Sequence, residues 1–327
     1  MSVPIDRRGF VRAAVGVLAA ASAARAQTSG KTWRVGWARA GAAGDPVDAA
    51  LRDGLRTLGY VDGSNLAIDT RYAQGRQDLY PVMVGELLGL KPDLLVVGGP
   101  AAVRAALKAT ATVPIVALDL ESDPVASGFV KSLNRPGGNL TGVFLDLPEL
   151  AGKQLQFLRD ALPSMKRVAV VWDPSVVRPQ FEATEAVARG AGIGLLSLPI
   201  RRIEDLDAAL TQAARERVNA LSVLTSPLFF AHRARIADLA LKQRLPSISI
   251  FSVYPEAGGL MAYGPNFPVM YRGVAAYVDR IFKGANPGEL PVERPTTFEL
   301  VINVKTAKVL GLALPQALLA RADRLIQ

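Results

Sequence analysis

The residues with the clearest chemical potential lie where an apolar run meets an alanine-rich run. Residues 94–106 read LLVVGGPAAVRAA, with four apolar residues, two glycines and a proline before an alanine-rich segment at helical spacing. This pattern predicts a buried strand that turns sharply into a helix, with Pro100 near the first helical position, where a missing N–H costs nothing. Such a helix start presents free backbone N–H groups and a partial positive charge. The group in front of this helix start is a nucleotide phosphate, a ligand carboxylate or only water, and the sequence of this segment does not choose among the three.

Charged and aromatic side chains stand at the ends of other predicted strands. Arg39 ends the first strand, where its guanidinium either pairs bidentately with a carboxylate or is solvated in a loop. Asp119 and Glu121 end the run VPIVALDLES and are suited to an ammonium group. Asp123 is instead predicted to cap the helix that follows it. The ring of Trp172 has the area to stack on a flat or apolar ligand, or to pack in the core.

Several kinds of chemistry are excluded by composition. The chain has no cysteine and one histidine, His232, which rules out disulfides, thiolate nucleophiles and cysteine- or histidine-based metal clusters. We interpret His232 as an exposed helical residue. The run LVVGGPAAVRAA has adjacent glycines but not the third glycine of a dinucleotide-binding turn, and no phosphate-binding loop or G-x-S-x-G motif is present. We therefore predict no enzyme, no cofactor and no metal site.

Chain length and charge further limit the class of protein. The chain has 327 residues, of which 50% are hydrophobic and 20% charged, so it is globular and long enough for two domains. The formal charge is +9, but basic residues are dispersed among acidic ones and aromatic residues make up 6%. A nucleic-acid groove more often clusters basic residues with stacking aromatic residues. We expect no nucleic-acid partner.

The N-terminal segment resembles a twin-arginine export signal. Arg7 and Arg8 precede a weakly hydrophobic run over residues 13–24 and an A-x-A site at residues 24–26, although Asp6 replaces the more usual serine or threonine. About twelve mostly small residues are too few to span the roughly 30 Å of a bilayer core. We expect residues 1–26 to be removed, which takes away four arginines and one aspartate and leaves a formal charge of +6. Without a cysteine to carry a lipid, the mature protein is expected free in the periplasm.

Apolar runs rich in β-branched residues alternate with amphipathic segments from Trp33 onward. This rhythm is typical of parallel sheets covered by helices on both faces. The number of runs predicts two doubly wound lobes, the first ending near RPGGNLTGV and the second beginning with LPELAGKQ. After Phe251 the pattern changes to a short extended piece, a long helix over residues 267–284, another extended run and a closing helix over residues 317–326.

Two blocks carry a family resemblance, RPGGNLTG at residues 135–142 and FELVINVKTAKVLGL at residues 298–312. From Trp33 to the C-terminus the chain resembles the ABC transporter substrate-binding protein family related to tryptophan and tyrosine uptake proteins. The resemblance implies a type I periplasmic-binding-protein fold with three crossovers, near Gly142, Gly264 and Pro295. The expected N-terminal lobe is residues 33–142 plus 264–294, and the expected C-terminal lobe is residues 143–263 plus 295–327.

The resemblance also implies a function. We expect the periplasmic solute-binding component of an ABC uptake transporter, which closes two lobes around a small organic anion such as an amino acid or other carboxylate. It would act as a monomer and deliver its small-molecule ligand to an ABC permease in the inner membrane. The alternative is a periplasmic ligand-sensing receptor domain that partners a sensor kinase, and the sequence does not separate the two.

The expected site lies in the cleft between the lobes, since open α/β sheets bind ligands at the carboxyl ends of their strands. In similar proteins the turn at Gly98 to Ala101 faces this cleft and holds a ligand carboxylate. Pro100 has no N–H, so the donors here would be the amides of Ala101 and Ala102. The predicted ligand-binding residues are Trp37, Arg39, Ala40, Gly99, Pro100, Ala101, Ala102, Asp119, Trp172, Ser175, Thr225, Ser226, Leu228 and Phe251.

Overall fold

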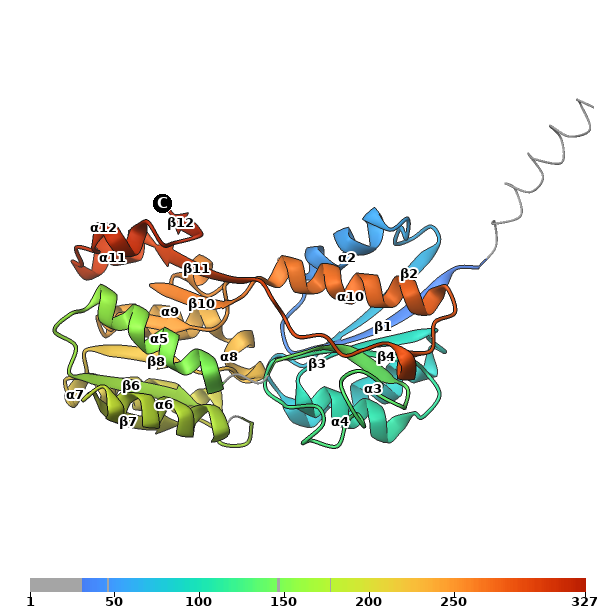
Figure 1. Ribbon diagram of the computed structural model, residues 1–327, viewed down its shortest axis with the longest axis horizontal. Coiled ribbons are helices and arrows are strands. Elements are labelled where there is room, and N and C mark those ends of the chain that lie inside the picture. The colour runs from blue at the N-terminus through green and yellow to red at the C-terminus, as the bar shows by residue number, and fades with distance from the viewer. Residues whose placement is uncertain (1–30, 46, 146–147, 177) are drawn as a thin grey trace, which may run out of the picture.

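The computed structural model describes residues 31–45, 47–145, 148–176 and 178–327. The predicted export signal, residues 1–26, lies outside the described residues. Two β-sheets lie side by side, each with helices packed on it, and Figure 1 shows them as two halves of the molecule. The predicted pair of α/β lobes is therefore confirmed.

The first lobe is built on a five-stranded sheet in the order β2-β1-β3-β4-β5, in which every pairing is parallel. Helices α3 and α4 pack together on one face of the sheet, and α2 packs with α10 on the other (Figure 1). Helices on both faces explain why β3 reads LLVVG and β4 reads IVALD, almost without polar residues. The elements are β1 (Trp33–Arg39), α2 (Val47–Thr57), β2 (Leu66–Tyr72), η1 (Gln77–Leu79), α3 (Tyr80–Gly89), β3 (Leu94–Gly98), α4 (Pro100–Ala109), β4 (Ile115–Asp119), β5 (Leu140–Phe144), α10 (Phe267–Phe282) and η4 (Pro287–Glu289).

The second lobe is built on a seven-stranded sheet in the order β12-β11-β10-β9-β8-β6-β7. Only the pairing of β10 with β11 is antiparallel among the described strands of this sheet. The elements are α5 (Pro148–Ala161), β6 (Arg167–Trp172), α6 (Arg178–Gly190), β7 (Gly194–Pro199), η2 (Ile203–Asp205), α7 (Leu206–Arg215), β8 (Ala220–Val223), α8 (Pro227–Ala231), α9 (Arg233–Lys242), β9 (Ser247–Ser249), η3 (Pro255–Ala257), β10 (Met261–Pro265), β11 (Phe298–Asn303), α11 (Val304–Leu310), α12 (Gln316–Leu319) and β12 (Arg324–Ile326).

Two local predictions from the sequence are wrong. The closing helix predicted over residues 317–326 ends at Leu319, and Arg324–Ile326 is instead strand β12, paired in parallel with β11. The Leu300 N–H donates to the Asp323 carboxylate at 2.7 Å, so pairing with β11 outweighs the helix propensity of the alanines. Asp123 accepts hydrogen bonds from two following amides at 2.8 and 2.9 Å, but it closes a turn rather than a helix.

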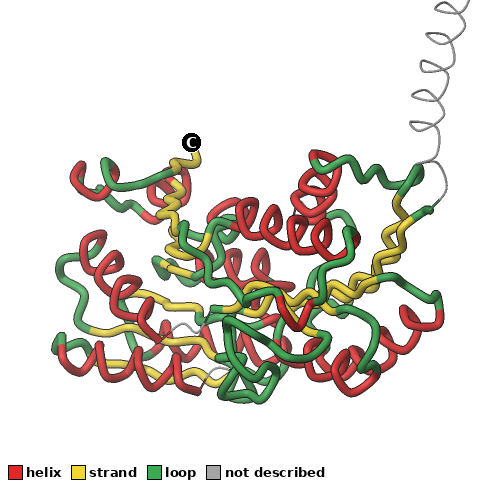
Figure 2. The backbone as a smooth tube through the Cα atoms, turned by 45° about the vertical axis from the view of Figure 1, so that its right-hand side comes forward, coloured by secondary structure: helices red, strands yellow, loops and turns green. Residues whose placement is uncertain are grey.

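The chain passes between the two sheets after β5, after β10 and before β11. Figure 2 shows loops and strands of the backbone tube running through the middle of the molecule. Glycine is required at two of these places. A Cβ on Gly142, whose φ is +140°, would lie 2.1 Å from the Ala117 carbonyl oxygen, and one on Gly264 would lie 1.9 Å from the Ile250 carbonyl oxygen. Two passages also touch, because the Glu293 N–H donates to the Gly142 carbonyl at 3.0 Å. The predicted residue boundaries of the lobes stay a prediction.

The core is continuous from one lobe to the other. One cluster of buried residues runs from Val35 and Trp37 through Phe230, Phe251 and Phe267 to Ile236. Phe230, Phe251 and Phe267 of that cluster lie where the lobes meet. No helix among the described residues is both long and apolar enough to cross a bilayer.

Candidate ligand-binding site

A small cavity lies between the two lobes, with a volume of about 60 Å³. Its walls come from the carboxyl ends of β1, β3 and β4, from helix α10, and from α8 and the segment after β9. Parallel strands end at the same edge of a sheet, which brings residues far apart in sequence to one place. The cavity is therefore at the position expected for a ligand in a two-lobed α/β protein.

Five aromatic rings line this cavity. Phe230 from α8 lies 5.2 Å from Phe251 and 5.7 Å from Phe267, measured between ring centroids. Trp37 at the end of β1 lies 5.9 Å from Tyr271 in an edge-to-face arrangement. All five are at least nine-tenths buried. We call Trp37, Phe230, Phe251, Phe267 and Tyr271 the aromatic wall.

Two helix caps determine where α8 and α10 begin and therefore where their aromatic rings lie. The Ser226 hydroxyl accepts a hydrogen bond from the Leu228 N–H at 3.1 Å and so starts α8. The Asn266 side chain likewise accepts from the Val269 N–H at 3.0 Å and starts α10. In α10, Phe267 and Tyr271 are one turn apart and share a face. These caps place rings from both helices on the same cavity.

Arg39 lines the cavity, and its positive charge is paired with nearby carboxylates. It is 3% exposed, contacts the Asp48 carboxylate, and lies 3.9 Å from the Asp45 carboxylate. Arg233 reaches across from the second lobe and pairs with Asp45 at 2.9 Å. The guanidinium also lies 4.9 Å from the ring centre of Trp37. Two cations and two carboxylates thus form one buried cluster that joins the lobes.

Glu121 lines the cavity without a basic partner among the described residues. Its Oε1 accepts a hydrogen bond from the Thr225 hydroxyl of the other lobe at 2.8 Å. Its backbone N–H donates to Asp119 Oδ1 at 2.9 Å, while Asp119 Oδ2 is buried and has no hydrogen-bond partner among the described residues. Burial and the neighbouring Asp119 raise the pKa of Glu121 well above its usual range, and burial raises the pKa of Asp119.

The start of α4 lies against these groups. Gly99 precedes the helix with a φ of +79° and no side-chain cap, and Pro100 is the first helical residue, as predicted. A Cβ on Gly99 would lie 3.0 Å from Pro227 of the second lobe and 3.5 Å from Glu121 Oε2. The helix start therefore meets both a carboxyl group and the opposite lobe.

The structure brings together part of the residue set predicted from sequence. Trp37, Arg39, Ala40, Gly99 and Phe251 line the cavity. Five further predicted residues lie next to it without lining it: Pro100, Ala101 and Ala102 in the first turn of α4, Asp119 behind Glu121, and Thr225 bonded to Glu121.

Other predicted residues lie elsewhere. Trp172 stacks on Phe181, with ring centroids 4.2 Å apart, and its indole N–H donates to the Ser197 hydroxyl at 2.9 Å. Ser175 and Leu228 line a separate pocket of about 490 Å³ at the rim between the lobes. Ser226 is buried and donates to Asp173 at 3.1 Å.

The rim pocket also contains His232, for which the prediction of an exposed helical residue is wrong. His232 is half-buried between the end of α8 and the start of α9, and burial lowers its pKa. Nearby, the Gln77 amide donates to Asp173 across the lobes at 3.4 Å. Contacts on both sides of the cavity thus join the two lobes.

The sequence prediction missed Phe230, Phe267 and Tyr271, and left Glu121 out of the final residue set. The strand-end rule does not find residues on helices. A signal for two of them exists in the sequence, because Ser226-Pro227 and Asn266 are helix starts, and aromatic residues follow both within one turn.

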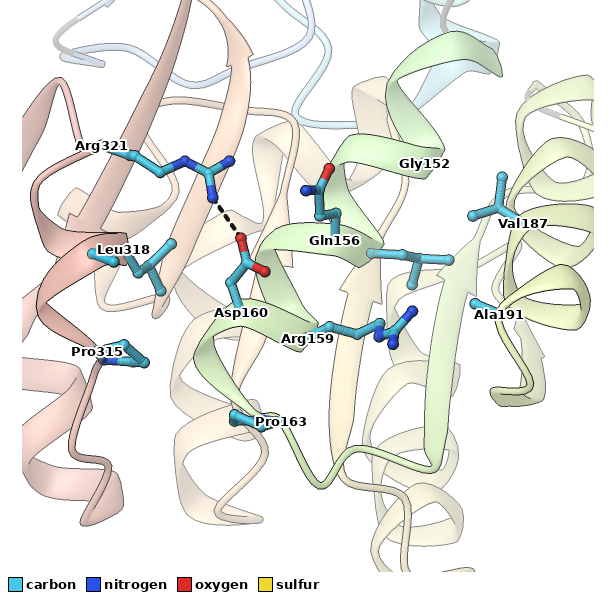
Figure 3. Close-up of a pocket in the computed structure, with 12 residues that line it drawn as sticks. Gly152, Gln156, Arg159, Asp160, Pro163, Val187, Ala191, Pro315, Leu318 and Arg321 are labelled. Atoms are coloured by element: carbon cyan, nitrogen blue, oxygen red, sulfur yellow. Dashed lines mark hydrogen bonds and ion pairs between the residues drawn. The ribbon is translucent and has the colours of Figure 1, made fainter.

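A larger groove of about 810 Å³ lies on the second lobe, between α5, α6 and α12. Figure 3 shows its lining, with the ion pair between Arg321 and Asp160 at 2.6 Å. Both side chains are partly exposed, at 48% and 32%. Because the groove involves one lobe and no buried unpaired side chain among the described residues, the cavity between the lobes is the better candidate.

Comparisons with known proteins agree on a family. A family model described as "ABC transporter substrate binding protein" matches residues 41–326. A tyrosine-binding protein of Clostridioides difficile is 24% identical over 273 residues, which cover 81% of this chain and 77% of that protein.

Solved structures are similar over most of the chain. A conserved domain protein of Vibrio cholerae has a TM-score of 0.79 and 28% identity, covering 90% of this chain and all of the other. A domain from Streptococcus pneumoniae in complex with L-Trp has a TM-score of 0.80 and 23% identity, with the same coverage. The similarity extends to both lobes.

Proposed function

Because this chain belongs to the ABC transporter substrate-binding protein family, we propose that it binds a small amino-acid-like solute between its lobes and delivers it to a membrane permease. The family predicted from sequence and the type I periplasmic-binding-protein fold are thereby confirmed. Members of this family bind solutes and are not enzymes.

The aromatic wall is the observation that carries the proposed ligand class. A cavity lined by aromatic rings favours a ligand with an apolar or aromatic body, and a few polar groups at its edge fix the ligand's orientation. Here the polar groups are Arg39 and Glu121. These two charges suit the carboxylate and ammonium groups of an amino acid. The tyrosine-binding relative and the structure with L-Trp support the same class.

The predicted anionic group of the ligand remains part of this proposal. Arg39 and the amides of Ala101 and Ala102 are the candidate contacts for a carboxylate, since the start of α4 adds a partial positive charge. Opening of the lobes would expose these groups, and closure would bury them with the ligand. We expect hinges near Gly142, Gly264 and Pro295.

We also propose that the protein is exported to the periplasm, acts as a monomer and binds no nucleic acid. Arg7 and Arg8 in the N-terminal segment support a twin-arginine route. Replacing both by lysine should block export, which fractionation of cells measures. Undiminished periplasmic protein in the double variant would contradict this route.

Calorimetry on the purified mature protein tests the ligand class. The panel contains aromatic amino acids, aliphatic amino acids, aromatic carboxylic acids and neutral sugars. We expect aromatic amino acids to bind, and small-angle scattering to give a smaller radius of gyration in the complex than in the free protein. Tight binding of a neutral sugar without binding of any amino acid would overturn the proposal.

A variant pair links binding to the cavity. Phe230→Ala removes one ring of the aromatic wall and should weaken binding by about tenfold or more. Val187→Ala, at a residue 37% exposed in the outer groove, is the matched control and should bind as the parent does. Equal losses in both variants would place the ligand outside the cavity.

A further inference from the structure

The charges around the cavity do not balance. Arg39 and Arg233 are matched by Asp45 and Asp48 in one buried cluster. Glu121 faces the cavity with no cation within ion-pair distance among the described residues. Glu121 is partly buried, and a carboxylate that has lost part of its hydration without gaining a cation is unfavourable, so it either binds a proton or is satisfied by a cation.

A second acidic group strengthens this imbalance. Asp119 accepts the N–H of Glu121, and its Oδ2 is buried with no hydrogen-bond partner among the described residues. Two carboxyl groups therefore stand together behind one wall of the cavity. Thr225 supplies one hydroxyl donor to Glu121, which neutralises no charge.

Aromatic rings on the other side of the cavity offer a second kind of contact for a cation. Aromatic faces attract a cation within about 6 Å of the ring centre, most strongly when water is excluded. Trp37 and Phe230 already lie against guanidiniums, with Arg39 at 4.9 Å and Arg233 at 4.8 Å from the two ring centres. Phe251 has no such cation among the described residues, and it lines the same small cavity as Glu121. The carboxyl group of Glu121, the ring of Phe251 and the guanidinium of Arg39 thus all face the space that a ligand enters.

We propose that the ligand is recognised chiefly through an ammonium group, held by Glu121 and the aromatic wall, and that a ligand carboxylate is dispensable. This inference rests on the proposed function and extends its ligand class from amino acids to aromatic or apolar amines, with or without a carboxylate. The ammonium takes the place of the missing cation beside Glu121 and replaces a proton on its carboxyl group.

The groups available to a carboxylate are fewer. Pro100 removes one N–H from the first turn of α4, and Gly99 gives its own N–H to the Leu118 carbonyl at 3.0 Å. Arg39 pairs with Asp45 and Asp48, so a ligand carboxylate would compete with them for its guanidinium, whose two Nη atoms are buried and make no hydrogen bond among the described residues. Glu121 itself lies against the start of α4, where it would repel a bound anion.

Affinity for an amine should depend on pH. Burial and Asp119 raise the pKa of Glu121, so acid keeps its carboxyl group neutral and weakens its attraction for an ammonium. Two other groups act on this pair: Arg104 favours the ionised form of Asp119, and the pKa of the nearby Tyr80 is raised by burial and by Glu121, with Arg39 opposing the increase. Affinity for an amine should therefore increase as pH rises.

Calorimetry on the parent protein with two trios of probes tests the inference. The trios are L-tyrosine, tyramine and 3-(4-hydroxyphenyl)propionate, and L-tryptophan, tryptamine and indole-3-propionate. In at least one trio the amine should bind within about tenfold of the amino acid, and the acid should bind about ten- to a hundredfold more weakly than the amine. An amine that loses as much affinity as the acid, or more, overturns the inference and leaves the proposed function intact. No binding by any probe overturns both.

A variant without the charge of Glu121 tests whether this residue causes the preference for the amine. Glu121→Gln keeps an oxygen for the Thr225 hydroxyl but removes the charge, so amine binding should weaken about ten- to a hundredfold while acid binding changes by less than about threefold. Glu182→Gln, at an exposed residue of α6, is the matched control and should change neither. Unchanged amine binding by Glu121→Gln overturns the inference. The probe comparison on the parent protein stands whether or not the variant folds.

Discussion

The cavity between the lobes and the groove on the second lobe differ in what surrounds them. The groove is far larger, about 810 Å³ against about 60 Å³. Its charged pair, Arg321 and Asp160, is partly exposed, whereas Arg39 in the cavity is 3% exposed and packed against Trp37. Size alone therefore does not identify the site. Buried charges and aromatic rings that converge from two lobes identify it.

The difference has an energetic basis. Charges in water are screened, and an exposed ion pair contributes little because each ion exchanges its hydration for its partner. Buried charges have lost that hydration and depend on their partners. The same residue type should thus respond very differently to substitution in the two regions, and matched variants measure this contrast.

The largest contrast is expected for arginine. Arg39→Met leaves Asp48 without its cation inside the protein and should lower the free energy of unfolding by about 3–5 kcal/mol. Arg321→Met in the groove should lower it by at most about 1 kcal/mol. Urea unfolding of both variants and the parent measures the difference. Similar losses would mean that Arg39 is effectively solvated and that the cavity is not a low-dielectric site.

Neutralising an acidic residue should change the free energy of unfolding in opposite directions in the two regions. Glu121→Gln removes a partly buried carboxyl group that lies beside Asp119 and has no cationic partner among the described residues, so at neutral pH it should raise the free energy of unfolding by about 1–3 kcal/mol. Asp160→Asn in the groove removes only an exposed ion pair and should lower it by at most about 1 kcal/mol. Thermal unfolding of both variants without ligand is the measurement. A destabilised Glu121→Gln protein would contradict the charge imbalance described above.

The pH dependence of the Glu121→Gln effect follows from linkage. The unfolded chain ionises Glu121 near its ordinary pKa of 4.5, while the folded protein holds the proton to higher pH. As pH rises above 4.5, the unfolded state of the parent gains stability relative to its folded state. The advantage of the glutamine variant should therefore be absent in acid and appear as pH rises. An advantage that is independent of pH would point to packing rather than charge.

The sequence predicted the parts of the fold that depend on local pattern. The apolar run at residues 94–98 followed by Pro100 is strand β3 and the start of α4, because a strand buried on both faces and a proline at the first helical turn leave little choice. Arg324–Ile326 was predicted wrongly, since its pairing with β11 depends on residues that are distant in sequence.

The same limit applies to the site. Trp37, Arg39 and Phe251 were found because strand ends of a parallel sheet gather at one edge. Tyr271 was missed because helical periodicity does not say which helix face meets a cavity in another part of the chain. For Trp172 the sequence left two alternatives, a ligand contact or the core, and it packs against Phe181 and Ser197 within the second lobe, a choice that depends on residues distant in sequence.

The smallest difference in stability between the two regions is expected for two glycines, and this pair also tests closure of the lobes around a ligand. Gly99 has a φ of +79°, and a Cβ there would lie 3.0 Å from Pro227 of the other lobe, so Gly99→Ala strains the backbone by about 1–2 kcal/mol and wedges the lobes apart. Gly152 lies in helix α5 at the groove, where the nearest atom to a Cβ is 3.8 Å away, so Gly152→Ala should stabilise the protein by about 0.5–1 kcal/mol. Because separation of the lobes would move Pro227 away from Gly99, Gly99→Ala should also weaken ligand binding by about tenfold and enlarge the radius of gyration with ligand present. Gly152→Ala should change neither. A Gly99→Ala protein that loses stability but binds and closes as the parent does would show that the start of α4 does not govern closure.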